Sequence, residues 1–314
     1  MRKGIFLLVT LSLAVPARAA EVDKLLPNDC ECVLTVNVTQ LLTSELNKKH
    51  GLLKMEELLK SNEGIQDHFK SLGLDPLKDI STLAWASANT GDPGKALIIM
   101  HGKFDPKKFE AKADEVVQNY GDILKIHKIG ASKLYEVGIP GQSPYFVAVP
   151  DSSTIIASAG KEYMIEALNK VAGTRKSEVK KELADLVRKV EGDRTLWLVA
   201  LKTALEHSPL SADDNARPVL AKIETGYLGV IVSRDLRAEF DLTTKTAETA
   251  KELNKELLEK LDKAKGIVSI LVGNVKELQI LLDLAEAMKV TSQGNTVSLR
   301  GQIGPEAIEK SLKD

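Results

Sequence analysis

The chain has 314 residues, and its 43 basic and 44 acidic side chains leave a net charge of −1. This balance gives no global attraction to nucleic acid or to anionic lipid. Aromatic residues make up 4% of the chain, too few to favour the exposed rings on which carbohydrates and nucleic acids stack.

A short apolar run opens the chain. Two basic residues precede it, it extends over Gly4–Val15, and Pro16 ends it. A membrane span needs about 20 apolar residues, so the run is too short for an anchor. Ala17–Ala19 then offers small residues at the two positions that a signal peptidase reads. We therefore expect residues 1–19 to be a secretory signal peptide, and the mature chain to be periplasmic or extracellular, without a transmembrane segment.

The mature chain has the size and pattern of two units. Removing the signal peptide takes away three basic residues and no acidic one, which leaves 40 basic against 44 acidic residues. About 295 residues is the size at which one core commonly divides into two. We expect a first unit over 20–175, a connecting amphipathic helix over 176–192 and a second unit over 193–314. The apolar positions of that helix are Val179, Leu183, Leu186, Val187 and Val190.

The two units repeat one order of elements. In the first, we expect a strand at 33–38, a hairpin at 82–104, a helix from Asp105-Pro106, an extra hairpin at 123–137, a hairpin at 145–159 and a helix at 162–171. In the second, we expect a strand at 195–201, a hairpin at 227–243, a helix at 246–264, one or two buried helices over 267–288, a hairpin at 288–302 and a helix at 305–312. Hairpins with intervening helices predict antiparallel sheets covered by helices, an α+β fold. Whether the two sheets are separate or joined edge to edge stays open.

Cys30 and Cys32 are two residues apart at the start of a predicted strand, so we expect both side chains on one face. They could form a redox pair or a disulfide, but a bond across one residue closes a small, strained ring. No electropositive neighbour is present to activate a thiol. Two small, half-buried apolar residues are the favoured interpretation.

Serine-based catalysis lacks its context. Two S-x-x-K matches exist, Ser158–Lys161 and Ser177–Lys180, but penicillin-binding enzymes also need S-x-N and K-T-G further along. The sole plausible S-x-N, Ser87–Asn89, precedes both serines, and K-T-G is absent. We predict no serine nucleophile.

Metal sites are equally unsupported. The five histidines are His50, His68, His101, His127 and His207, and none forms H-x-x-x-H or H-x-H. His101 and His127 lie on predicted strands that could be neighbours, and such a pair could bind metal. The usual third ligand is not evident, so isolated histidines are favoured.

Other partial motifs have ordinary interpretations. Gly94-Lys95 resembles the end of a phosphate loop but lacks its first glycine, and Ala96 replaces the hydroxyl residue. Asp213–Asn215 lacks the spaced ligands of a calcium loop and is expected to be a solvated turn. Asn37–Thr39 is a glycosylation sequon inside a predicted strand. We therefore predict no catalytic, cofactor-binding or metal-binding residues and no cofactor.

The opening of the mature chain carries a resemblance. Leu26–Asp29, Val33–Val38 and Gln40–Leu42 follow the signal peptide, and the helix entries Phe104-Asp105 and Gly160-Lys161 come later. In these features the chain resembles uncharacterised secreted proteins that are abundant in planctomycete bacteria. The resemblance implies a bacterial envelope or extracellular location and brings no activity, cofactor or substrate.

Three functions compete. The first is a non-catalytic binding or structural protein of the cell envelope, with an envelope protein or ligand as its unknown partner and no nucleic acid. The second is an enzyme assembled from distant residues, which a deep pocket holding His101, His127 and an acid would support. The third is a carrier of an apolar ligand between curved sheets and helices, which a continuous apolar cavity would favour.

Overall fold

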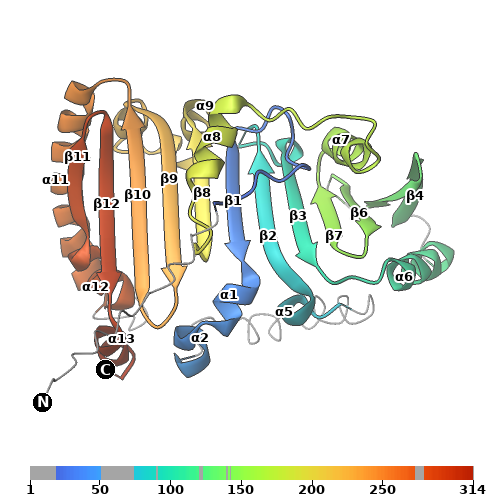
Figure 1. Ribbon diagram of the computed structural model, residues 1–314, viewed down its shortest axis with the longest axis horizontal. Coiled ribbons are helices and arrows are strands. Elements are labelled where there is room, and N and C mark those ends of the chain that lie inside the picture. Colours follow the sequence, from blue (N-terminus) through green and yellow to red (C-terminus); the bar gives the residue numbers. More distant parts are fainter. Residues whose placement is uncertain are drawn as a thin grey trace, which may run out of the picture.

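One antiparallel sheet extends through the described part of the chain (Figure 1). The computed structural model describes residues 19–50, 74–89, 91–119, 123–138, 141, 143–272 and 279–313. In these ranges the sheet has 12 strands in the order β11-β12-β10-β9-β8-β1-β2-β3-β7-β6-β5-β4. With the helices on its two faces, the fold is α+β, which confirms the predicted class.

The strands, in chain order, are β1 (Cys32–Asn37), β2 (Ile80–Ser87), β3 (Ala96–Gly102), β4 (Leu124–Ile129), β5 (Ser132–Val137), β6 (Tyr145–Asp151), β7 (Thr154–Ser158), β8 (Leu196–Leu201), β9 (Ile223–Val232), β10 (Leu236–Thr244), β11 (Lys289–Gln293) and β12 (Thr296–Ile303). The junction between the two predicted sheets is the pairing of β1 with β8, in which Leu34 lies opposite Leu198. The two sheets are therefore joined edge to edge.

The helices are α1 (Val38–Thr43), α2 (Glu45–His50), α5 (Pro76–Asp79), α6 (Pro106–Asn119), α7 (Lys161–Val171), α8 (Lys181–Lys189), α9 (Lys202–Glu206), α10 (Arg217–Leu220), α11 (Ala247–Val272), α12 (Gln279–Ala287) and α13 (Pro305–Lys313). Of the buried helix predicted over 267–288, residues 273–278 lie outside the described ranges. Among the helices described, none combines the length and apolar character needed to cross a membrane.

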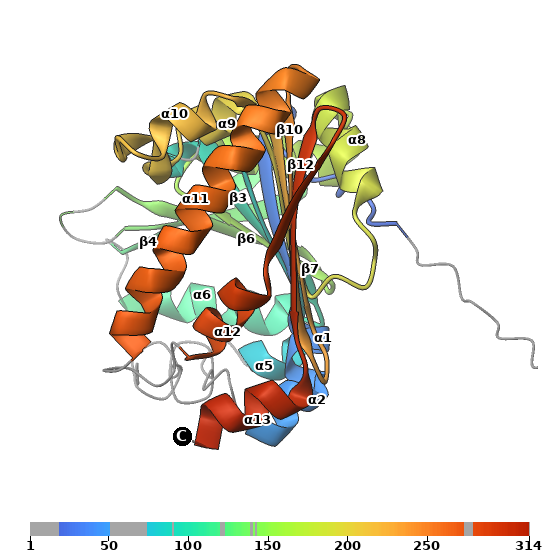
Figure 2. The same ribbon diagram turned by 90° about the vertical axis from the view of Figure 1, so that its left-hand side faces the viewer.

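The sheet has two differently covered faces. On one, which we call the α7–α8 face, Met164 of α7 and Leu183 of α8 are fully buried against Val33 and Ile99 of the strands. Helices α6 and α11 cover the other face, the α6–α11 face (Figure 2), with α6 at one end of the sheet and α11 at the other (Figure 1). Alternate residues of each strand point to opposite faces, so both faces are apolar over the central strands.

The connecting helix is shorter than predicted. Helix α8 begins at Lys181 rather than near residue 176. The backbone N–H of Glu178 donates to Asn28 Oδ1 at 2.9 Å, and Lys180 forms an ion pair with Glu31. These contacts with the N-terminal segment compete with a first helical turn, which the apolar periodicity alone could not reveal.

The prediction that Cys30 and Cys32 share a face is wrong. Strand β1 begins at Cys32, so Cys30 precedes the regular alternation. Cys30 belongs to the core of the α7–α8 face, whereas Cys32 packs with Ala200 and Ala204 on the opposite side. Both are free thiols, and burial raises the pKa of each to about 12. Neither thiol is poised to react near neutral pH.

Candidate functional site

Helix α6 starts where the sequence predicts it. The Asp105 carboxylate accepts hydrogen bonds at 3.1 Å from the backbone N–H groups of Lys107 and Lys108, and Pro106 occupies the first helical position. One side of the helix presents Phe109, Ala113 and the pair Val116 and Val117 toward the sheet. This spacing of three and four residues makes an apolar stripe.

Between that stripe and the sheet lies a cavity of about 410 Å³. Its walls are almost entirely apolar. They include Phe109, Ala113 and Val116 of α6, Val147 of β6, and Ile155 and Ala157 of β7. A volume of this size falls within the range of about 300–1,000 Å³ found for small-molecule sites. We call this cavity the α6 pocket.

Helix α6 packs on the sheet through a small apolar cluster with Leu124 and Tyr135, and the rest of its stripe is only partly buried. Of the helix's residues, only Ala113 is buried. Ile123, which lines the far end of the pocket, is 42% exposed. Two strand residues that line the pocket, Leu124 and Tyr135, are buried. The ring of Tyr135 packs edge-on against Phe109, with ring centroids 5.1 Å apart. Such a hollow exposes apolar surface that a ligand could cover.

Charge is confined to the rim. The charged lining residues are Lys103, Asp105 and Lys112. Burial, and then the nearby Glu110 and Asp114, raise the pKa of Tyr135 to about 12. The hydroxyl of Tyr135 is therefore neutral at ordinary pH and adds no charge to the lining.

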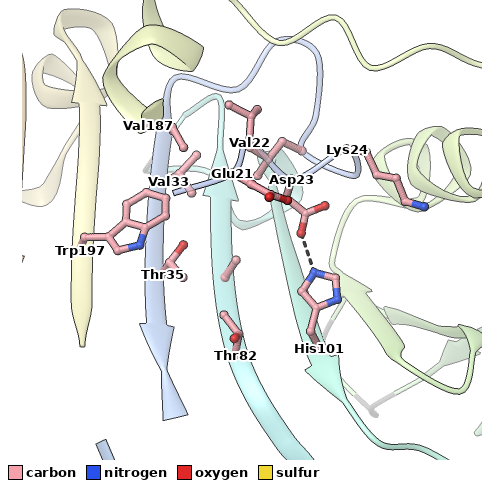
Figure 3. Close-up of a pocket in the computed structure, with 12 residues that line it drawn as sticks. Glu21, Val22, Asp23, Lys24, Val33, Thr35, Thr82, His101, Val187 and Trp197 are labelled. Carbon is pink, nitrogen blue, oxygen red and sulfur yellow. Dashed lines mark hydrogen bonds and ion pairs between the residues drawn. The ribbon is translucent and has the colours of Figure 1, made fainter. Parts of the chain in front are cut away.

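A second cleft, of about 420 Å³, lies on the α7–α8 face between residues 21–26 and strands β8, β1, β2 and β3 (Figure 3). Trp197 forms one wall, and the side chains of Thr35 and Thr82 line the middle. At the other side, His101 Nε2 lies 2.6 Å from Asp23 Oδ2. This pair ties the N-terminal segment to β3.

The interaction between His101 and Asp23 also affects the pKa of the histidine. The hydrogen bond to Asp23 raises the pKa of His101, desolvation opposes this, and a backbone hydrogen bond to Ser153 adds to the increase. Asp23 is also occupied on its other oxygen, which accepts from the Leu25 backbone N–H at 2.8 Å. Asp23 therefore connects His101 of β3 with the backbone of the N-terminal segment at Leu25.

The structure does not bring His101 and His127 together. Strands β7, β6 and β5 lie between β3, which carries His101, and β4, which carries His127. His127 Nε2 pairs instead with Glu136 Oε2 at 2.6 Å. His207 Nδ1 lies 2.7 Å from the Thr203 carbonyl oxygen, and His68 is outside the described ranges. Within those ranges, no group of three or more His, Cys, Asp or Glu residues could hold a metal ion.

Two other sequence candidates have structural roles. The Ser158 hydroxyl donates to the Ala96 carbonyl at 2.5 Å and accepts from the Gly160 N–H at 2.8 Å, so it fixes the start of α7. Asn37, the sequon residue, caps α1 by accepting from the Gln40 N–H at 2.9 Å.

The remaining partial motifs are packing and turn features. Gly94 sits against Gly160, where an added Cβ would clash with the Gly94 carbonyl. Asp213 accepts from two backbone N–H groups of its own turn, those of Asn215 and Ala216. Neither motif forms a binding loop.

A charged hollow also lies on the α7–α8 face, over β9, β10 and β12. Its charges pair with each other: Arg194 Nε lies 2.6 Å from Glu239 Oε1, and Arg300 Nη2 lies 2.8 Å from Asp241 Oδ1. Arg194 also donates to the Tyr227 hydroxyl at 3.1 Å. Several of its charged side chains are thus paired within the protein, and its lining is less apolar than that of the α6 pocket.

Comparisons with known proteins add little. No protein-family model matches the chain, and no curated protein matches it. Among solved structures, crystal form I of TP0453 is similar over 94% of this chain and 98% of that chain, with a TM-score of 0.48 and 12% sequence identity. The site must therefore be interpreted from its own residues.

Proposed function

We propose that this chain is an exported, non-catalytic binding protein of the bacterial cell envelope whose ligand is apolar and occupies the α6 pocket. The observation that carries this proposal is the cavity of about 410 Å³ with almost wholly apolar walls. An apolar ligand there would cover side chains that α6 leaves partly exposed. Each Å² of apolar surface removed from water contributes roughly 25 cal/mol.

We also infer that the sheet arose from two related units, as the repeated element order suggests. Outward from the β1–β8 junction, the order β1-β2-β3-β7-β6 is matched by β8-β9-β10-β12-β11. Helix α6 follows β3 as α11 follows β10, and α7 follows β7 as α13 follows β12. On this view α6 and α11 are equivalent helices of the two units, and α6 differs in that it forms one wall of a pocket.

The test compares ligand binding by the purified mature chain with binding by a variant in which a larger side chain fills the pocket. The filling variant is Ala113→Phe, and the matched control is Ala111→Phe, because Ala111 is exposed on the same helix. A ligand at 100 times its dissociation constant should stabilise the folded chain by about 2.7 kcal/mol.

We expect dodecanoate and dodecanol to raise the melting temperature of the wild type and of Ala111→Phe, but not of Ala113→Phe. Circular dichroism of each variant reports whether it is folded. Equal stabilisation of both variants would place the ligand elsewhere, and no stabilisation of the wild type would reject the proposal.

A further inference from the structure

A lysine interrupts the apolar stripe of α6. Lys112 lies three residues after Phe109 and four before Val116, on the side of the helix that faces the sheet. Its side chain is 28% exposed, and its amino group pairs with Glu115 at 2.9 Å. Glu115 is 58% exposed, and such surface pairs contribute little, about 0–1 kcal/mol. Lys112 is thus a cation at an apolar position, held outward by a weak partner.

A second lysine also lines the pocket. Lys103 directly follows β3 and lines the pocket beside Phe104. Within the described ranges, its side chain has no ion-pair or hydrogen-bond partner. A long, flexible stem lets an ammonium group swing toward a ligand while its methylene groups stay on apolar surface.

Asp105 is the one acidic residue among the described residues that line the pocket. The Asp105 carboxylate is committed to the first turn of α6, where it accepts from two backbone N–H groups. Ile123, Leu124 and Val137, which also line the pocket, are apolar. Among the described residues that line the pocket, two lysines therefore stand against one aspartate, and the remaining lining residues are apolar or aromatic.

We propose that the ligand is a long-chain carboxylic acid, with its carboxylate between Lys103 and Lys112 and its chain extending under α6 toward Leu124. This inference rests on the proposed function and names the class of ligand. Charge-assisted hydrogen bonds from two ammonium groups suit a carboxylate. The volume of about 410 Å³ lies near the lower end of the range for ligand sites, which fits one acyl chain rather than the two of a phospholipid.

The experiment measures displacement of a fluorescent apolar probe from the mature chain by dodecanoate and by dodecanol, which differ in the head group. The ratio of the two affinities is the readout. The variant is Lys103→Met with Lys112→Met. The control is Lys107→Met with Lys108→Met, which removes the same charge from exposed positions of the first turn that do not line the pocket.

We expect wild type and control to bind dodecanoate about tenfold more tightly than dodecanol. The Lys103 and Lys112 double variant should bind both about equally. Shortening the acid to decanoate should weaken binding about fourfold for each methylene group lost.

Each other outcome has a distinct meaning. Equal affinity of wild type for the acid and the alcohol would overturn the inference of a carboxylate ligand, but the proposed apolar binding site would still be supported. A preference that survives in the double variant would overturn the assignment of the two lysines. Tighter binding of single-chain lysophosphatidate than of dodecanoate would replace the carboxylate by a phosphate head. If nothing displaces the probe, the proposed function falls as well.

Discussion

Helices α6 and α11 lie on the same face of one sheet but relate to it differently (Figure 2). On α11, Ala250 and Leu253 are fully buried against Val297, which is itself fully buried. On α6, Ala113 is the only buried residue. Both helices carry an amphipathic pattern, so the stripe alone does not decide how closely a helix packs. What differs is whether side chains from the strands fill the space beneath, and where they do not, a pocket remains.

The largest expected effect comes from truncating one apolar residue on each helix and comparing the stability that is lost. Leu253→Ala should lower the free energy of unfolding by about 2–5 kcal/mol, since it leaves a cavity in a packed core. Phe109→Ala should cost clearly less in the unliganded protein, because Phe109 is half-exposed and already borders empty space. Urea denaturation of both variants measures the difference. Equal losses would mean that α6 is packed as tightly as α11.

A bound ligand should narrow the difference between the stability losses of Leu253→Ala and Phe109→Ala. When a long-chain acid at 100 times its dissociation constant fills the α6 pocket, we expect the wild type to gain about 2.7 kcal/mol. Phe109→Ala should gain less, because it loses wall contacts with the ligand, whereas Leu253→Ala should gain the full amount. Denaturation with and without dodecanoate gives both gains. A smaller gain in Leu253→Ala than in Phe109→Ala would mean that the ligand binds under α11.

The sequence predicted what local chemistry decides. The Asp105-Pro106 cap gave the start of α6, and the turn before β3 gave a hairpin. It could not predict the β1–β8 pairing, which joins residues 160 to 168 positions apart. The pocket escaped prediction for a related reason. Its walls come from α6 and several strands, and the distance between them depends on side-chain packing across the whole face. The lysine at position 112, inside an apolar stripe, was the one local signal.

The smallest expected effect concerns the opposite face, where the His101–Asp23 pair closes the second cleft. The Asp23 carboxylate raises the pKa of His101 in the folded state above the ordinary histidine value of about 6.5. The pair therefore contributes its full stability below about pH 6.5 and loses it as the pH rises through the raised pKa of His101.

The contribution is modest, because the His101 side chain is 38% exposed. In Asp23→Asn, the stability difference from wild type should shrink between pH 6 and pH 9, as measured by urea denaturation. His127→Gln, which removes the other histidine–carboxylate pair, controls for general loss of such pairs and should leave the Asp23-dependent change intact. A difference between wild type and Asp23→Asn that stays constant with pH would show that Asp23 acts through its bond to the Leu25 backbone rather than through His101. A difference that shrinks with rising pH would instead show that the second cleft is held closed by a titratable pair, unlike the α6 pocket, whose apolar walls do not titrate.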